Sequence, residues 1–73
     1  MYADKDYATK SELRRAVQEG NLTSQDFYQP NGDLYGVTVP QTGKIDVEGP
    51  HYPKLHRWYA EVWFENGKAV RVR

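Results

Sequence analysis

The chain contains no cysteine, and in 73 residues that absence limits how a fold can be stabilised. Disulfide bridges and zinc sites built on thiolates are both excluded. A chain this short buries only about 60% of its unfolded surface, so the packing of a small core must supply the stability, with self-association as a further source. We therefore expect one small domain over residues 1–73, in which residues 1–8 form a loosely ordered leader.

Charge is balanced over the whole chain but not along it. Ten basic and ten acidic residues cancel, which argues against general affinity for polyanions. Residues 1–48 hold five Lys/Arg against eight Asp/Glu, whereas residues 49–73 hold five against two. The C-terminal third is therefore the mildly basic end.

Aromatic content and short apolar runs indicate a folded protein outside the membrane. Aromatic residues make up 14% of the chain and can bury large areas. No apolar run reaches the roughly 20 residues that cross a bilayer, and the N-terminus has no recognisable signal sequence. We expect a cytoplasmic protein without a cofactor, of the kind found among small accessory proteins of bacteria and phage.

The N-terminal third carries helix signals. Thr9 and Glu12 form a capping-box pattern, apolar residues follow at helical spacing, and Gly20 can take the left-handed conformation that ends a helix. This pattern predicts a helix over residues 10–19. A second capping pattern at residues 23–26 is soon followed by a proline, so it predicts only one turn.

From a turn predicted at residues 30–33 to the C-terminus, the pattern is typical of β-hairpins. In the first hairpin, Val39 opposite Ile45 brings the apolar residues of both strands onto one face. The next pair in that register is Val37 with Val47. The connecting loop is then a three-residue one ending at a glycine.

The second hairpin can be read in two registers. A two-residue Asn66-Gly67 turn pairs Val62 with Arg71, whereas a three-residue loop pairs Val62 with Val70. We predict the three-residue loop because it collects the apolar residues on one face. The inner face then carries Trp58, Ala60, Val62, Val70 and Val72. The outer face carries Tyr59, Glu61, Trp63, Ala69, Arg71 and Arg73, with Glu61 opposite Arg71 and Tyr59 opposite Arg73.

These elements predict an α+β fold. It consists of one short N-terminal helix and a mainly antiparallel sheet of about four strands in two hairpins. An open sheet with the helix on one face is expected, and a sheet curled toward a small barrel is the alternative.

Residues 49–57 join the two hairpins and are rich in proline, histidine and aromatic residues. Pro50 and Pro53 stiffen this segment, and the Tyr52–Pro53 bond can be cis, although trans is the default. One interpretation is a rigid connector whose Tyr52 and Leu55 pack over the open end of the core. The other is a preformed recognition loop that loses little entropy on binding.

The histidines raise two chemical alternatives. His51 and His56, with Asp46 and Glu48, offer nitrogen and oxygen ligands, but their spacing matches no zinc signature, so we predict no metal site. Glu48, the two histidines and Arg57 are also the residue types of a metal-free ribonuclease. Because they are sequence neighbours rather than residues gathered from several strands, we favour a non-enzymatic protein.

The outer sheet face carries aromatic residues and arginines, and the helix can cover only one face of the strand that bears both tryptophans. Such a face can bind a protein or single-stranded nucleic acid, or be buried within the monomer. We predict a module that binds a protein partner or itself. The predicted binding residues are His51, Tyr52, His56, Arg57, Tyr59, Trp63, Arg71 and Arg73. The alternative is a single-stranded nucleic-acid binder or small ribonuclease using His51 and His56.

Overall fold

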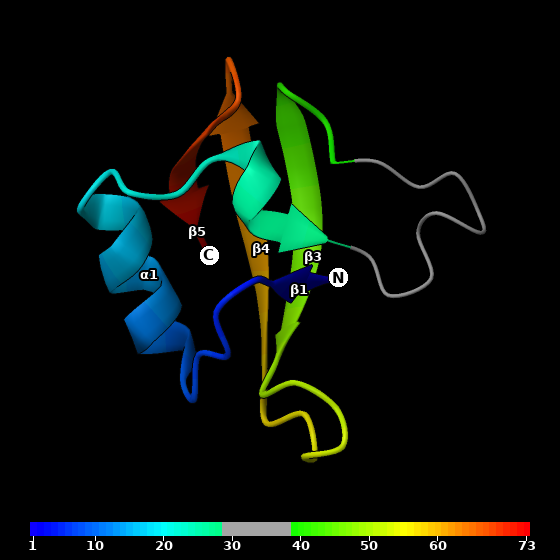
Figure 1. Ribbon diagram of the computed structural model, residues 1–73. Helices are drawn as coiled ribbons and strands as arrows, with labels where there is room; N and C mark the ends of the chain where they lie inside the picture. Colours follow the sequence, from blue (N-terminus) through cyan, green and yellow to red (C-terminus); the bar gives the residue numbers. More distant parts are fainter. Residues whose placement is uncertain (29–38) are drawn as a thin grey trace.

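The computed structural model describes residues 1–28 and 39–73. This part of the chain contains one α-helix, one 3-10 turn and five strands, and their arrangement can be followed in Figure 1. In chain order they are β1 (Tyr2–Ala3), α1 (Lys10–Gln18), η1 (Ser24–Asp26), β2 (Phe27–Tyr28), β3 (Gly43–Gly49), β4 (Trp58–Glu65) and β5 (Lys68–Val72). No helix within the two described ranges is long and apolar enough to cross a membrane.

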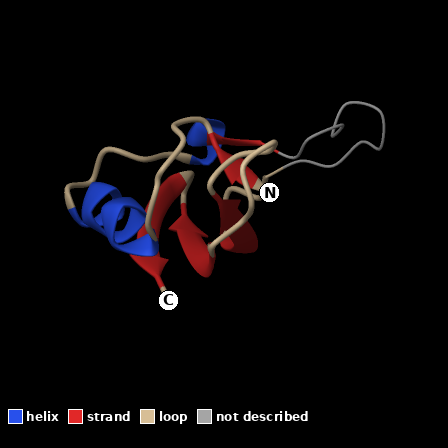
Figure 2. Ribbon diagram, turned by 90° about the horizontal axis from the view of Figure 1, so that it is seen from below, coloured by secondary structure: helices blue, strands red, loops and turns tan. Residues whose placement is uncertain are grey.

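The strands form two antiparallel sheets, so the α+β prediction is confirmed. The larger sheet has the order β3-β4-β5, and β1 pairs with β2 in a separate small sheet. Helix α1 and the small sheet lie on the same side of the larger sheet (Figures 1 and 2). The described strands do not close into a barrel.

Helix α1 begins and ends close to the predicted limits. The Thr9 hydroxyl accepts a hydrogen bond from the Glu12 amide at 3.3 Å. The Glu12 carboxylate accepts from the Ala8 amide at 3.0 Å rather than from the Thr9 amide that the capping box predicted. Gly20 follows the helix with a φ of 77°, the left-handed conformation expected of it.

The second capping pattern produces the single turn η1. The Asp26 carboxylate accepts from the Thr23 amide at 2.7 Å, and the Thr23 hydroxyl accepts from the Gln25 amide at 3.2 Å. Phe27 comes directly after this turn and lies buried in the core.

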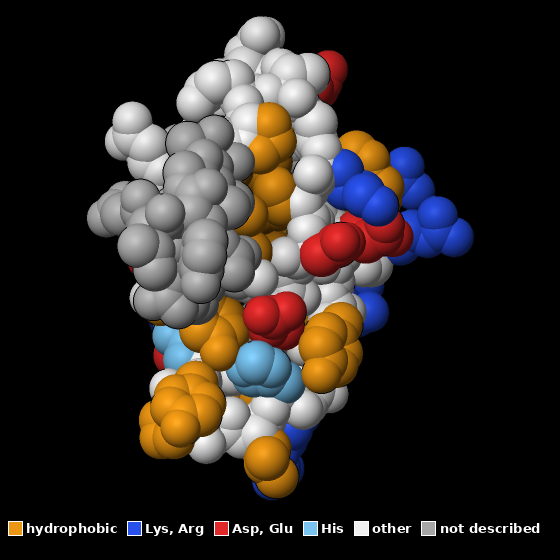
Figure 3. Space-filling view, turned by 90° about the vertical axis from the view of Figure 1, so that its right-hand side faces the viewer, with side chains coloured by type: hydrophobic (Ala, Val, Ile, Leu, Met, Phe, Trp, Pro, Cys, Tyr) orange, Lys and Arg blue, Asp and Glu red, His pale blue; other side chains and the backbone are white. Residues whose placement is uncertain are grey.

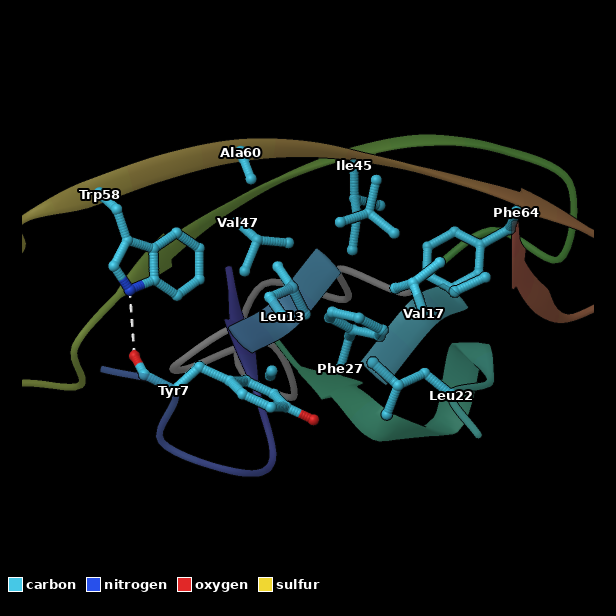
Figure 4. Close-up of a cluster of buried hydrophobic side chains, with 13 residues drawn as sticks. Tyr7, Leu13, Val17, Leu22, Phe27, Ile45, Val47, Trp58, Ala60 and Phe64 are labelled. Carbon is cyan, nitrogen blue, oxygen red and sulfur yellow. Dashed lines mark hydrogen bonds between the residues drawn. The ribbon is translucent and has the colours of Figure 1, made fainter. Parts of the chain in front are cut away.

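The core lies between the larger sheet and the layer formed by α1, η1 and β2 (Figure 4). The sheet contributes Ile45, Val47, Ala60, Val62 and Phe64, and the opposite layer contributes Leu13, Val17, Leu22 and Phe27. The rings of Phe27 and Phe64 meet edge to face, with 5.4 Å between their centroids. Trp58 closes one end of the core, where its indole N–H donates to the Tyr7 carbonyl at 3.0 Å.

Residues 1–8 belong to the fold, in contrast to the loosely ordered leader expected from the sequence. Strand β1 pairs with β2, and Tyr2, Ala3 and Tyr7 are buried. The strand signal is weak because β1 has only two residues and its partner is distant in the sequence. Burial in a low-dielectric setting raises the pKa of the Tyr7 hydroxyl.

The pairing of Val39 with Ile45, predicted for the first hairpin, is wrong. Strand β3 pairs with β4 instead, so that Ile45 lies opposite Val62. Val39 is outside any strand, although it is partly buried against the core. The following residue, Pro40, has no N–H to donate to a ladder. Val37 and the turn predicted at residues 30–33 lie outside the described residues.

The second hairpin does not have the predicted three-residue loop. Its turn is the two-residue Asn66-Gly67, in which both residues have positive φ angles of 50° and 81°. This conformation is the one that Asn-Gly favours between two antiparallel strands. Glu65 and Lys68 therefore form the first pair after the turn.

A β-bulge then corrects the register of the apolar residues. Phe64 lies opposite Ala69 but Trp63 lies opposite Arg71, so Val70 is an extra residue in β5. Past the bulge, Val72 faces Val62 on the inner side. Ala69 is consequently buried and Val70 exposed, the reverse of the prediction.

Candidate functional site

Residues 49–57, hereafter the 49–57 loop, connect β3 to β4 at the lower end of the molecule in Figure 1. The Gly49 carbonyl accepts from the Arg57 amide at 2.6 Å, which closes the base of the loop. Gly49 also packs on Trp58, since a Cβ at this position would lie 2.8 Å from the indole Nε1 and closer still to two ring carbons. The Gly49–Pro50 and Tyr52–Pro53 bonds are both cis.

Tyr2 anchors the inner side of this loop. Its hydroxyl accepts from the Tyr52 amide at 3.3 Å and lies 2.7 Å from Nε2 of His56, so its own hydrogen can be donated to that ring nitrogen. The His51 ring stacks on the Tyr2 ring, with centroids 4.7 Å apart. Both histidines are half-buried by this arrangement. They hold the loop against β1.

Asp6 anchors the outer side of the loop. Its carboxylate accepts from the His51 amide at 2.9 Å and forms an ion pair with Lys54 at 3.3 Å. The His51 amide, assisted by the Lys54 ammonium, lowers the pKa of the Asp6 carboxyl. Neither Tyr2 nor Asp6 was among the predicted site residues, because both lie in the segment expected to be a leader.

The tip of the loop is exposed, although its backbone is held at several points. Tyr52 and Leu55 are each 81% exposed, so the interpretation that they pack over the core is wrong. Tyr59 is 65% exposed, and its ring meets that of His56 edge to face at 6.4 Å. Figure 3 shows hydrophobic side chains gathered around histidine at this end of the molecule.

The outer face of the larger sheet differs from the loop tip in its charge. It includes these outward side chains of β3, β4 and β5 together with the C-terminal residue: Lys44, Asp46, Glu48, Tyr59, Glu61, Trp63, Arg71 and Arg73. Cations and carboxylates are mixed on this face, whereas the loop tip is largely apolar.

Trp63 and Arg71 stack at the centre of the outer face. The guanidinium carbon lies 4.9 Å from the tryptophan ring centroid, a cation–π distance. Lys44 pairs with Glu61, which lowers the pKa of the carboxyl and raises that of the ammonium. The predicted outer-face pairs are wrong: the bulge places Arg71 opposite Trp63, and Arg73 exchanges backbone hydrogen bonds with Glu61.

The four residues of the acid–base alternative have different partners. Glu48 binds the N-terminal ammonium of Met1 at 3.2 Å, and both histidines contact Tyr2. Arg57 is exposed. Among the residues that the structure describes, no group of three histidine, cysteine or acidic side chains could hold a metal ion.

The predicted binding residues therefore form two adjoining groups. His51, Tyr52, His56 and Arg57 lie on the 49–57 loop, and Trp63, Arg71 and Arg73 lie on the outer face. Tyr59 belongs to the outer face and contacts the loop through His56. No protein-family model, curated protein or solved structure matches the chain.

Proposed function

We propose that the protein is a small, non-enzymatic interaction module that binds a protein partner through the 49–57 loop and the adjoining Tyr59. The observation that carries this proposal is the exposure of Tyr52 and Leu55, at 81% each, on a loop whose backbone is held at both ends and in the middle. Exposed aromatic and aliphatic side chains on an ordered support are typical of protein-binding surfaces.

Preorganisation supports the same function. Ordering a flexible loop at an interface consumes part of the binding free energy. In the 49–57 loop, Tyr2 and Asp6 already fix the backbone at Tyr52 and His51. A partner would then need to order only the exposed side chains.

The charge of the adjoining outer face favours a protein over a nucleic acid. Lys44, Arg71 and Arg73 share this face with three carboxylates, and Lys44 is already paired with Glu61. A single-stranded nucleic acid would instead require a continuous positive groove. The proposal keeps the cytoplasmic setting and the small accessory role that the sequence predicts.

Affinity capture with loop variants tests the proposal. Immobilised wild type and a Tyr52→Ser/Leu55→Ser double variant are incubated with a lysate of the source organism, and bound proteins are identified by mass spectrometry. Val70→Ser is the matched control, because Val70 is also apolar and 45% exposed but lies on β5. Circular dichroism verifies that all three proteins are folded.

We expect wild type and Val70→Ser to capture the same partner, and the double variant to lose it. Sedimentation of the three proteins shows whether a second copy is that partner. Capture that is unchanged in the double variant, or lost equally in Val70→Ser, would refute the proposed surface. Capture that requires RNA in the lysate would support the nucleic-acid alternative instead.

A further inference from the structure

A shallow pocket lies beside the 49–57 loop. It is lined by Ala8, Pro50, Lys54, Leu55 and Arg57. Three of these side chains are apolar, and the other two end in cations. Ala8 comes from the segment before α1, so the pocket is formed between that segment and the loop.

The two cations of the pocket differ in how they are neutralised. Lys54 forms an ion pair with Asp6, and the Asp6 carboxylate is further occupied by the His51 amide. Arg57 is exposed, and within residues 1–28 and 39–73 no carboxylate lies within ion-pair distance of its guanidinium. The rim therefore carries one positive charge that the described part of the chain does not balance.

The residues that line the pocket favour a carboxylate-bearing peptide over a single-stranded nucleic acid. A guanidinium binds a carboxylate in a fork geometry with two parallel hydrogen bonds. Binding of single-stranded nucleic acid relies on aromatic side chains that stack on the bases. The pocket lining contains no aromatic residue and is mainly aliphatic. Its chemistry is complementary to an aliphatic side chain with a carboxylate close by.

We infer that this pocket receives an acidic peptide segment of the protein partner, with an aliphatic side chain against Pro50 and Leu55 and a carboxylate on Arg57. The inference rests on the proposed function, because it names the chemistry of the partner that the same loop would bind. It differs from that proposal in depending on Arg57 rather than on the apolar tip alone.

Defined peptides test the inference. The probe is a fluorescein-labelled peptide in which leucine and glutamate alternate with serine spacers, and its match has glutamine in place of glutamate. Fluorescence anisotropy at low salt gives both affinities for wild type, Arg57→Gln and Arg15→Gln. Arg15 is the matched control, an exposed arginine on helix α1.

We expect wild type and Arg15→Gln to bind the glutamate peptide about tenfold or more tightly than the glutamine peptide, the usual effect of one charged hydrogen-bonded pair. Arg57→Gln should lose this preference. The inference would be overturned if wild type bound the two peptides with equal affinity or showed no saturable binding of the glutamate peptide. It would also be overturned if an oligouridine displaced the labelled glutamate peptide more effectively than the unlabelled peptide does.

The two proposals can fail separately. If the captured partner still binds Arg57→Gln but not the Tyr52→Ser/Leu55→Ser variant, the apolar loop tip is the binding surface and the acidic peptide is excluded. If the partner binds every variant equally, both proposals fail. Amide chemical shifts of Ala8 and Leu55 on titration with the glutamate peptide locate its binding in the pocket.

Discussion

Trp58 and Trp63 lie on the same strand in opposite environments. Trp58 is buried and donates its indole N–H to Tyr7, whereas Trp63 is half-buried beneath Arg71 on the outer face. Because side chains alternate along a strand, the sequence predicts this division correctly. It could not predict Tyr7 as the partner, since that residue lies in the segment expected to be a leader.

The two tryptophans should differ in their contribution to stability. We expect Trp58→Ala to lower the free energy of unfolding by about 3–5 kcal/mol, as for other buried aromatic deletions. Trp63→Ala should cost about 1 kcal/mol, mainly the loss of its contact with Arg71. Urea denaturation measures both values. Equal losses in the two variants would contradict the assignment of the inner and outer faces.

The 49–57 loop illustrates what local sequence can say about an element. Its prolines indicate stiffness, and hydrogen bonds hold the loop at several points. The ties, however, come from Tyr2 and Asp6, near the other end of the chain. Contacts between distant segments leave no local pattern, so the histidines could not be identified as supports for the loop from their sequence alone.

The anchor at Asp6 should depend on pH. The pKa of the Asp6 carboxyl is lowered in the folded protein, so the carboxylate stabilises the fold at pH values above the ordinary aspartate range of about pH 4. This stabilisation is lost as the pH falls through the lower pKa of the folded state. The His51 amide resonance, followed by NMR from pH 6 downward, should shift in that acidic range. In Asp6→Ala the shift should be absent, and an identical titration in both proteins would rule out the anchor.

The hairpin of β4 and β5 illustrates why register was mispredicted. The Asn66-Gly67 signal favoured a two-residue turn, whereas matching of apolar residues favoured a three-residue loop. The structure has the two-residue turn, and a bulge at Val70 returns Val72 to the inner face while Val70 itself stays exposed. A bulge has little sequence signature of its own, so the two local signals conflict when only the sequence is considered.

At the scale of the molecule, the fold class was predictable and the division into two sheets was not. Helix caps and alternating apolar residues are local signals, and they predicted the helix and the main strands. Strands β1 and β2 have two residues each, too few to show a period. They exist because burial of Tyr2, Ala3 and Phe27 completes the core.

Removal of residues 1–8 should therefore unfold most of the protein. Burial of a large apolar side chain stabilises a fold by about 1.5–3 kcal/mol, and the deletion removes Tyr2 and Tyr7 from a domain of small total stability. Thermal denaturation followed by circular dichroism should lose its cooperative transition. Asp4→Ser, an exposed substitution in the same segment, should leave the transition nearly unchanged. A truncated protein that still melts cooperatively would contradict this prediction.

The contact between Gly49 and Trp58 restricts how this sequence can evolve. The indole occupies the space in which any larger residue at position 49 would place its first side-chain carbon. The two positions cannot vary independently, because a side chain at 49 becomes tolerable only after the ring at 58 has been replaced by a smaller one. Diverged copies of this chain should therefore keep the glycine and the tryptophan together or replace both.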